Sequence, residues 1–363
     1  MKMHWGLLVG LLALPVAAFA QEVEGGPVGL PMGVSYSSVI SPSVQAGQTL
    51  EDRFKKGDRM FTLSAENDSL TRSGDRYYTN GLRLSWLELK SRPPEWAEWV
   101  AEHVPMFNAG NPMAVQYTIG QNMYTPSKIN IYGPQYGDRP YAGYLYGSVG
   151  LTEGDGDVVN DLEMSLGVVG PLSFAEQTQV NFHHLIHVHP PKGWDNQLHN
   201  EPAIGLSWAR RWPTFWETPV WGGGAVGLMP SVGVTVGNVY DLASAGASLM
   251  WRSDASAVMD NPLRVRPSIP GTGYYATNSK PVFTLSVGAE QRAVARNIFL
   301  DGNTFGDNDI NVQKRNFVTD LQASAGVSWN RYRLAYTTVY RTKEFYGQRR
   351  GQVFGGLNFS FKY

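Results

Sequence analysis

The sequence predicts an all-β fold, a transmembrane antiparallel up-and-down β-barrel of about 12 strands, and three observations support this prediction. Aromatic residues make up 12% of the chain and charged residues only 17%, whereas soluble domains typically carry roughly 25% charged residues. After the N-terminal segment, no run of residues is long and apolar enough to form a membrane-spanning helix. Short stretches instead alternate apolar and polar residues, as strands do when one face contacts lipid and the other a polar interior.

The N-terminal residues are predicted to be a targeting segment and a linker. In residues 1–20, Lys2 precedes an apolar run, and Ala18-Phe19-Ala20 forms an A-x-A cleavage pattern, which together indicate a signal peptide that is removed on export. Residues 21–57 are rich in Gly, Pro, Ser and Val without a clear period and are predicted to form a flexible N-terminal extension in the periplasm. The barrel domain is expected to span residues 58–363.

Composition also excludes some classes of protein. The chain contains no cysteine, which in an exported protein excludes a disulfide framework and a lipid-modified N-terminal cysteine. The formal net charge is −1 and gives no indication of nucleic-acid binding.

The C-terminus, QVFGGLNFSFKY, has the clearest strand pattern. One face would carry apolar residues and the other polar ones, namely Val353, Leu357, Phe359, Phe361 and Tyr363 against Gln352, Asn358, Ser360 and Lys362. A terminal aromatic residue after such alternation is typical of the closing strand of a bacterial outer-membrane barrel. An edge strand of a sandwich is the alternative, but the same alternation recurs in several other segments, for example 158–168 and 317–329.

Twelve strands follow from these patterns, at residues 59–67, 77–88, 114–123, 141–151, 158–169, 202–212, 222–235, 244–252, 282–291, 316–329, 331–342 and 352–363. The segment 244–252 has the poorest alternation. Twelve is an even number, as single-chain bacterial barrels require, and ten or fourteen strands remain open.

An even barrel with both ends in the periplasm has its odd-numbered connections on the outside. The periplasmic connections should be short, as those at 152–157 and near Asn330 are. Those at 89–113 and 253–281 are longer than this rule allows. The first of these contains EWAEWVAEHV, which predicts a short helix with Trp96 and Trp99 against the barrel rim.

Three connections with chemically active side chains, 65–81, 121–143 and 170–202, are expected on the same outer side. The third is predicted to contain a short extracellular α-helix, because Ser173 and Glu176 form an S-x-x-E capping box and Pro190-Pro191 prevent continuation. Gln179, His183 and His187 would share one helix face. The apolar residues of the other side, which we expect to lie on the barrel wall, are Phe174, Phe182, Leu185 and Ile186.

The histidine-rich stretch NFHHLIHVH allows three interpretations. His183 and His187 have the spacing of two metal ligands on a helix, but a zinc site needs a third ligand, and His184 stands where H-E-x-x-H would have Glu. One histidine could instead act as a general base, because imidazole titrates near working pH. A solvated surface cluster is the third interpretation.

The first connection has a different chemistry. It carries an oxygen-rich set of side chains, Glu66, Asn67, Asp68, Ser69, Asp75 and Thr79. Hard oxygen ligands suit Ca²⁺ rather than zinc, although the spacing is not that of an EF-hand. The same residue types are also ordinary loop formers.

Several short motifs, taken in order, resemble those of the lipid A 3′-O-deacylase family of outer-membrane β-barrels. They are END at 66–68, YTNG at 78–81, QNMYTP at 121–126, GDRPYAG at 137–143, and Gly170-Pro171 followed by GWDNQL and Glu201-Pro202. The resemblance extends from about Met60 to Tyr363.

This resemblance implies a calcium-dependent ester hydrolase of the bacterial outer membrane. It implies removal of the 3′-linked acyloxyacyl chain from lipid A of lipopolysaccharide, at a site that faces the outer leaflet, and insertion by the barrel assembly machinery. The family's metal and catalytic positions correspond to Asn67, Asp68 and Thr79. Its catalytic base corresponds to His183, by the spacing from Gly170 and from Trp194.

One position departs from the family pattern. The family carries a Glu six residues after the base, where this chain has His189. Asp195 or Glu201 could take its place. Lys128 and Arg139 are candidate contacts for substrate phosphates, together with Arg349 and Arg350. Gln179 is a candidate for orienting His183 or a water molecule.

Two other functions fit a barrel of this type. A passive pore or transport barrel would need a water-filled lumen, and twelve strands leave only a narrow one. A structural or adhesive barrel would bind partners through its loops. Only the clustered loop residues and the family resemblance favour the hydrolase over both.

Overall fold

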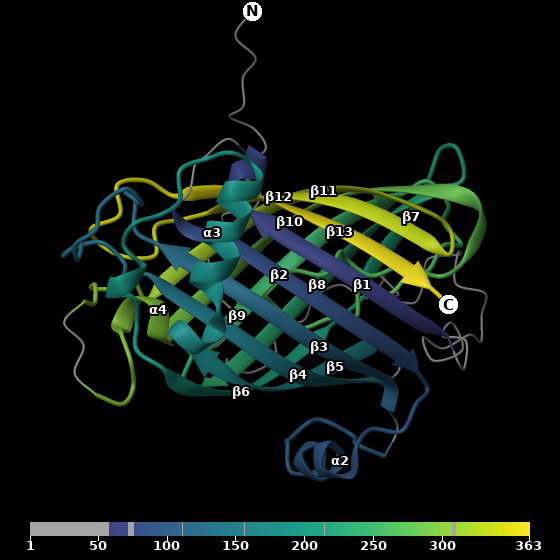
Figure 1. The fold of residues 1–363 in the computed structure, drawn as a ribbon. Coiled ribbons are helices and arrows are strands. Elements are labelled where there is room, and N and C mark those ends of the chain that lie inside the picture. The colour runs from purple at the N-terminus through teal and green to yellow at the C-terminus, as the bar shows by residue number, and fades with distance from the viewer. Residues whose placement is uncertain (1–57, 72–75, 111, 156, 214, 307–309) are drawn as a thin grey trace, which may run out of the picture. The chain divides into compact units, whose positions relative to one another are not determined.

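The computed structural model describes residues 58–71, 76–110, 112–155, 157–213, 215–306 and 310–363. These residues form a closed antiparallel barrel of 12 strands with one additional strand and few helices, so the predicted fold class is confirmed (Figure 1). The predicted signal peptide and N-terminal extension, residues 1–57, lie outside the described residues.

The strands and helices carry the labels of Figure 1. The strands are β1 (Arg59–Asn67), β2 (Tyr77–Leu89), β3 (Pro112–Thr125), β4 (Ala142–Asp155), β5 (Val158–Val169), β6 (Glu201–Arg211), β7 (Trp216–Val220), β8 (Gly224–Gly237), β9 (Tyr240–Arg252), β10 (Asn278–Asn297), β11 (Phe317–Asn330), β12 (Tyr332–Arg341) and β13 (Gln352–Lys362). The helices are α2 (Glu95–Glu102), α3 (Ala175–Leu185) and α4 (Ile298–Asp301), with 3-10 turns η3 (Asp68–Thr71), η4 (Pro171–Ser173) and η5 (Trp194–Asn196). No helix of the described ranges is long and apolar enough to cross a membrane.

Consecutive strands pair with one another except β6 and β7, and two pairings between strands that are not consecutive close the barrel. β1 pairs with β13, and β6 pairs with β8 over Arg211 to Gly205. The extra strand β7 pairs with the other half of β8, from Trp216↔Leu228 to Val220↔Gly224. β6 and β7 therefore pair with different halves of β8 on the same side, and β7 does not add a thirteenth strand to the barrel. We call the end with Arg59 and Tyr363 the terminus end and the opposite end the loop end.

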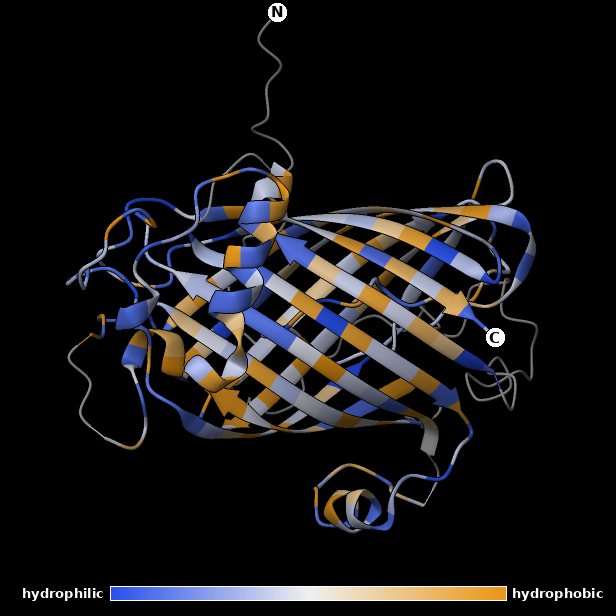
Figure 2. Ribbon diagram, viewed as in Figure 1, coloured by the Kyte–Doolittle hydropathy of each residue, from blue (hydrophilic) through white to orange (hydrophobic). Residues whose placement is uncertain are grey.

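Apolar and polar residues alternate along the strands, as Figure 2 shows, because successive side chains point to the outside and to the inside of the wall. In β13, Leu357 and Phe359 are 41% and 43% exposed on the outside, whereas Asn358 and Ser360 are buried inside. Because the outward side chains are apolar, the exterior of the barrel suits lipid. The exposed apolar residues of the strands include Ile119, Leu166, Ile204, Val236, Leu285, Val287, Leu321 and Leu334.

Packed side chains fill the lumen toward the loop end. Phe299 of α4 stacks on Tyr124 of β3 with ring centroids 4.0 Å apart and also contacts Tyr240 of β9. The hydroxyls of Tyr124 and Tyr240 share a hydrogen bond of 2.6 Å. This aromatic cluster, which also includes Tyr78, Tyr144, Tyr146 and Phe354, closes the inside of the barrel between opposite walls.

The long connection between β9 and β10, residues 253–277, also enters the lumen. Its Arg264 forms an ion pair with Glu66 of β1, and its Arg266 forms one of 2.7 Å with Glu163 of β5. These carboxylates lie on strands that are four places apart in the barrel, so the connection bridges two parts of the inner wall. The rule of short connections at this end fails here because the segment is a plug, held by buried charge pairs.

The other long connection contains α2 on the outside of the wall. Ala97 and Ala101 are fully buried against Val115, Leu151 and Leu162 of β3, β4 and β5. The expectation that Trp96 and Trp99 face the barrel was wrong, because they are 52% and 62% exposed. Small alanine side chains allow the helix to approach the wall closely, so the large indoles point away from it.

Candidate active site on the outside of the barrel wall

The helix α3 lies on the outer surface of β3 and β4 near the loop end. Gly143 of β4 permits this contact, since a Cβ atom there would lie 2.4 Å from the Cβ of Ala175. The Gln121 side chain of β3 donates a 2.7 Å hydrogen bond to the carbonyl of Ser173, just before the helix. Met123 and Trp194 complete a small cluster with Ala175. The wall therefore fixes the N-terminal half of α3.

The face of α3 that meets the barrel is opposite to the predicted one. Ala175, Gln179 and His183 are buried, whereas the apolar residues expected on the wall point outward. Their exposed fractions are 55% for Phe174, 45% for Phe182, 75% for Leu185 and 48% for Ile186. The prediction followed the rule for helices of soluble proteins, whose apolar face packs on the protein. An apolar outward face is stable where lipid surrounds it instead.

The predicted capping box is absent. The hydroxyl of Ser173 donates to the carbonyl of Gly170 at 2.6 Å, and Phe174 occupies the N-cap in the left-handed region with φ 57°. At the other end, His187 also has φ 57°, and the amide of Val188 donates to the carbonyl of His183 at 2.9 Å. His187 follows the C-cap residue Ile186 and has the left-handed conformation that is typical just after the end of a helix.

The four histidines of this segment have different environments. His183 is buried, whereas His184, His187 and His189 are exposed. The Nδ1 atom of His183 lies 2.8 Å from the carbonyl oxygen of His189. Because a carbonyl only accepts, Nδ1 carries the proton in this contact. Within the described ranges, no group of three or more His, Cys, Asp or Glu side chains could hold a metal ion.

Gln179 has a structural contact in addition to its predicted role. Its Oε1 accepts a 2.9 Å hydrogen bond from the indole of Trp194, which ties α3 to the GWDNQL segment. Near the start of the helix, partial burial and then the carboxylate of Asp195 raise the pKa of Glu176. The helix and the segment that follows it are therefore coupled by the favourable Gln179–Trp194 hydrogen bond and by the unfavourable repulsion between Glu176 and Asp195.

The two carboxylates considered in place of the family Glu have different surroundings. Asp195 is exposed. Glu201 is buried, and its carboxylate accepts hydrogen bonds from Asn238, Asn303 and the amide of Thr304. Glu201 therefore joins three segments at the loop end of the barrel.

The oxygen-rich set of the first connection divides between the two sides of the wall. Glu66 faces the lumen and pairs with Arg264, so it is separated from the other oxygens. Asn67 is half-buried, and its Oδ1 accepts a 2.7 Å hydrogen bond from the amide of Ser69. Asp68 is fully buried and accepts a 2.8 Å hydrogen bond from the amide of Arg76. Asp75 lies outside the described residues.

The strand registers connect these oxygens with α3. Asn67 pairs with Asn80 in β2, Asn80 with Met123 in β3, and Met123 with Gly143 beneath α3. Neighbouring strands lie about 4.8 Å apart, so Asn67 and Met123 are about 10 Å apart along this row.

Thr79 belongs to the same region of the wall. It is buried, and its hydroxyl lies 2.7 Å from that of Thr125 at the end of β3. The contact joins β2 and β3 two residues beyond Met123, which packs against α3. The predicted residues of the first and third connections thus lie along one stretch of the wall.

The predicted basic contacts lie in different environments. Lys128 is exposed, as are Arg349 and Arg350. Arg139 is fully buried, forms a 3.1 Å ion pair with Glu344, and lies over the ring of Tyr124. The sequence offered no signal of this ion pair, because Glu344 is far away from Arg139 in the chain.

A closed barrel with an apolar exterior and a polar, packed interior defines the class of outer-membrane β-barrel proteins. Within this class, the chain belongs to the family of the outer membrane protein LpxR, whose model matches residues 30–363. The resemblance found in the motifs is therefore confirmed.

Among solved structures, LpxR from Salmonella typhimurium is similar with a TM-score of 0.69 at 19% identity, covering 83% of this chain and 99% of that chain. At this identity the likeness shows the fold. The beta domain of the Bordetella autotransporter BrkA has 10% identity, coverages of 85% and 99%, and a TM-score of 0.37. The translocator domain of NalP from Neisseria meningitidis has 11% identity, coverages of 86% and 90%, and a TM-score of 0.34. No curated protein sequence matches.

Proposed function

We propose that this protein is a calcium-dependent lipid A 3′-O-deacylase of the bacterial outer membrane, which hydrolyses the ester of the 3′-linked acyloxyacyl chain. The observation that carries the proposal is the burial of His183 between α3 and the barrel wall, on the same stretch of wall as Asn67 and Thr79. A base placed on the outside of a lipid-facing barrel suits a substrate that is itself part of the membrane.

His183 would act as the general base. With its Nδ1 proton directed at the His189 carbonyl, Nε2 can take a proton from water, and the resulting hydroxide attacks the ester carbonyl carbon. The ester C–O bond then breaks, the acyloxyacyl chain leaves as a carboxylic acid, and the proton held by His183 passes to the sugar oxygen. A backbone carbonyl orients the ring here, so the family Glu is not needed at position 189 for that purpose.

Calcium fits the chemistry of the oxygens on this stretch of the wall. Asn67, Asp68 and Thr79 offer an amide, a carboxylate and a hydroxyl, all of them hard ligands. Asp68 is fully buried, and one of its oxygens accepts a backbone amide, which holds the carboxylate in one orientation. When bound, calcium would polarise the ester carbonyl and stabilise the oxyanion.

The outward apolar residues of α3 support a lipid substrate. Phe182, Leu185 and Ile186 lie on the side of the helix away from the wall, where acyl chains of the outer leaflet would surround them. Exposed Lys128, on the connection hydrogen-bonded to the segment after α3, is a candidate for a lipid A phosphate.

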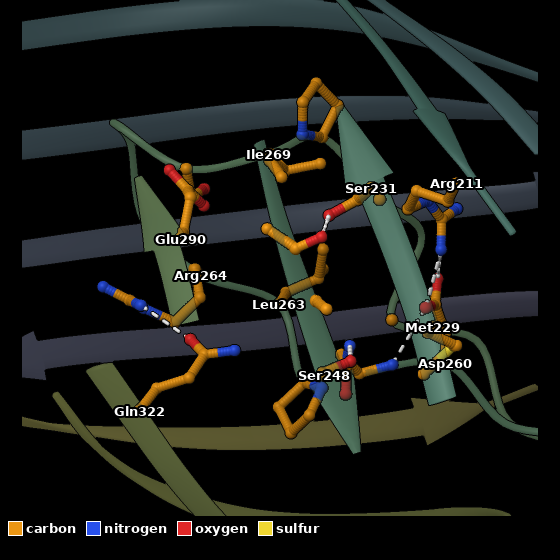
Figure 3. A pocket seen from close by; sticks show the side chains of 18 of the residues that line it. Arg211, Met229, Ser231, Ser248, Asp260, Leu263, Arg264, Ile269, Glu290 and Gln322 are labelled. Atoms are coloured by element: carbon orange, nitrogen blue, oxygen red, sulfur yellow. Dashed lines mark hydrogen bonds and ion pairs between the residues drawn. The ribbon is translucent and has the colours of Figure 1, made fainter. Parts of the chain in front are cut away.

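The interior of the barrel counts against a passive pore. A cavity of about 90 Å³ lies between the plug and the strands β8 to β11, lined by Arg264, Asp260 and Gln322 among others (Figure 3). Ligand pockets usually measure roughly 300–1,000 Å³. Arg211 and Asp260, both in the lining of this cavity, form an ion pair of 2.7 Å, and the aromatic cluster packs in the lumen toward the loop end.

The test is hydrolysis by the purified protein. Detergent-solubilised protein is incubated with hexa-acylated lipid A and calcium, and the products are analysed by mass spectrometry. We expect release of one acyloxyacyl unit from the 3′ position. Intact lipid A after incubation with correctly folded protein would contradict the proposal, and loss of a different chain would contradict the assigned position.

A further inference from the structure

The helix α2 is the second helix on the outside of the barrel, and its residues divide into three faces. Ala97 and Ala101 are buried on the wall, with Val100 and Val104 packed beside them. At 100° per residue, the remaining positions separate into two flanks. One flank carries Trp96, Trp99 and His103, and the other carries Glu95, Glu98 and Glu102.

The aromatic flank of α2 is exposed, and two of its rings are in contact. Trp96 and Trp99 are 52% and 62% exposed. The ring of His103 lies 4.6 Å from that of Trp99, and its Nδ1 is 2.7 Å from the Trp99 carbonyl. Two neighbouring indoles directed away from their own protein, next to a row of carboxylates, need surroundings that are apolar on one side and aqueous on the other.

The wall beneath α2 is the lipid-facing exterior. Val115, Leu151 and Leu162, which contact the helix, have the same outward orientation as Ile119 and Leu166, which are 53% and 64% exposed further along β3 and β5. The surface covered by α2 is therefore continuous with the apolar band of the barrel. Figure 1 shows α2 outside the strands, viewed nearly along its own axis.

The position of α2 along the wall corresponds to one edge of that band. Val115 lies under α2, and Met123, eight residues further along β3, packs with Ala175 of α3. Eight residues of strand span about 26 Å. With the usual strand tilt of roughly 40°, this is about 20 Å along the membrane normal, close to the apolar band of roughly 25 Å found in such barrels.

We propose that α2 is an interfacial helix that anchors the barrel in the leaflet at its terminus end, with Trp96 and Trp99 inserted at the level of the phospholipid headgroups and the glutamate flank in water. Indoles are enriched at this level because their rings are apolar and their N–H groups donate to polar headgroups. The inference concerns the helix alone and is independent of the proposed hydrolysis.

The chain itself offers a clean test because it contains no cysteine. Four single variants, Trp96→Cys, Trp99→Cys, Glu98→Cys and Glu102→Cys, are spin-labelled and reconstituted into phosphatidylethanolamine–phosphatidylglycerol vesicles at low protein density. The accessibility of each label to oxygen, which dissolves in lipid, and to a water-soluble nickel chelate is then measured. Heat-modifiable migration in gels confirms that each variant is folded.

We expect the oxygen-to-nickel ratio at positions 96 and 99 to be several-fold higher than at 98 and 102, both of which should resemble water-exposed sites. Equal, water-like ratios at all four positions would overturn the proposal. A high ratio at 96 and 99 that occurs only at high protein density, with dipolar broadening between labels, would also overturn it, because the flank would then bind a second copy of the chain.

Discussion

The Nδ1 atom of His183 lies 2.8 Å from the backbone carbonyl of His189. This contact bears on the position where the family carries Glu and this chain does not. A carbonyl belongs to every residue type, so the ring of His183 is oriented without a carboxylate at position 189. The exposed imidazole of His189 has no part in this contact.

The first prediction concerns position 189. His189→Ala keeps the carbonyl and should retain activity within a few-fold of the unchanged protein. His189→Glu, which introduces the family residue, should also be active. Release of the acyl chain from lipid A by purified variants is the measurement. A loss in His189→Ala as large as that in a base variant would mean that the imidazole itself takes part.

The second prediction separates the histidines. His183→Ala should lower the rate by roughly 100-fold to 10,000-fold, the usual contribution of a general base. His184→Ala and His187→Ala are matched controls on exposed positions of the same segment and should keep most of the activity. Equal losses of activity in His183→Ala and His187→Ala would instead favour the interpretation of these two histidines as paired metal ligands.

Calcium dependence is the third prediction. A chelator should abolish hydrolysis, and calcium, but not zinc alone, should restore it. Asp68→Asn should raise the calcium concentration for half-maximal activity on the order of tenfold, since ligand charge sets the affinity of oxygen sites. Glu102→Gln, at an exposed carboxylate of α2 far from this stretch of the wall, is the control and should leave this concentration unchanged. Full activity in chelator, or recovery with zinc alone, would contradict the ligand assignment.

A fourth prediction follows from the raised pKa of Glu176, to which burial and Asp195 contribute. A raised pKa means that the docked helix favours the protonated carboxyl of Glu176. The stability gained from this protonated carboxyl is fully present below about pH 4, the ordinary pKa of a glutamate. It is lost as the pH rises through the raised pKa. Asp195→Asn should therefore slow amide hydrogen exchange in α3 at pH 7. Near pH 4 the variant and the unchanged protein should exchange alike, and a difference of the same size at both pH values would refute the coupling.

Most of the barrel could be predicted from the sequence because each strand lies between two different environments. In β13, the apolar residues Leu357 and Phe359 are on the lipid-facing side, and the polar residues Asn358 and Ser360 are on the inner side. The alternation is therefore visible in the local sequence. β7 was not predicted, since the five residues WETPV do not alternate and pair with only part of β8. All twelve predicted barrel strands are present.

The contents of the lumen could not be predicted, because they depend on pairs far apart in the chain. Arg264 reaches Glu66 and Arg139 reaches Glu344, and no local pattern indicates such partners. The orientation of α3 was predicted wrongly for a different reason. The rule that apolar residues face the protein holds in water, and α3 has its apolar face on the outside of a lipid-facing wall.

The site residues were proposed by resemblance, and the structure adds which of them share one side of the wall. Burial distinguishes His183 from its three neighbours, and strand register aligns Asn67 with the base of α3. Neither fact is visible in the histidine-rich stretch itself, where His183 and His187 look equivalent until His187 is found to lie just after the end of the helix.

The most direct test of the proposed activity is the mass spectrum of lipid A from cells that express the unchanged protein, from cells that express His183→Ala at the same level in the outer membrane, and from cells without the protein. We predict loss of the 3′-linked acyloxyacyl chain only with the unchanged protein. An identical lipid A pattern in all three, with the barrel shown to be folded in the membrane, would contradict the proposed activity, and deacylation by His183→Ala would contradict the assigned base.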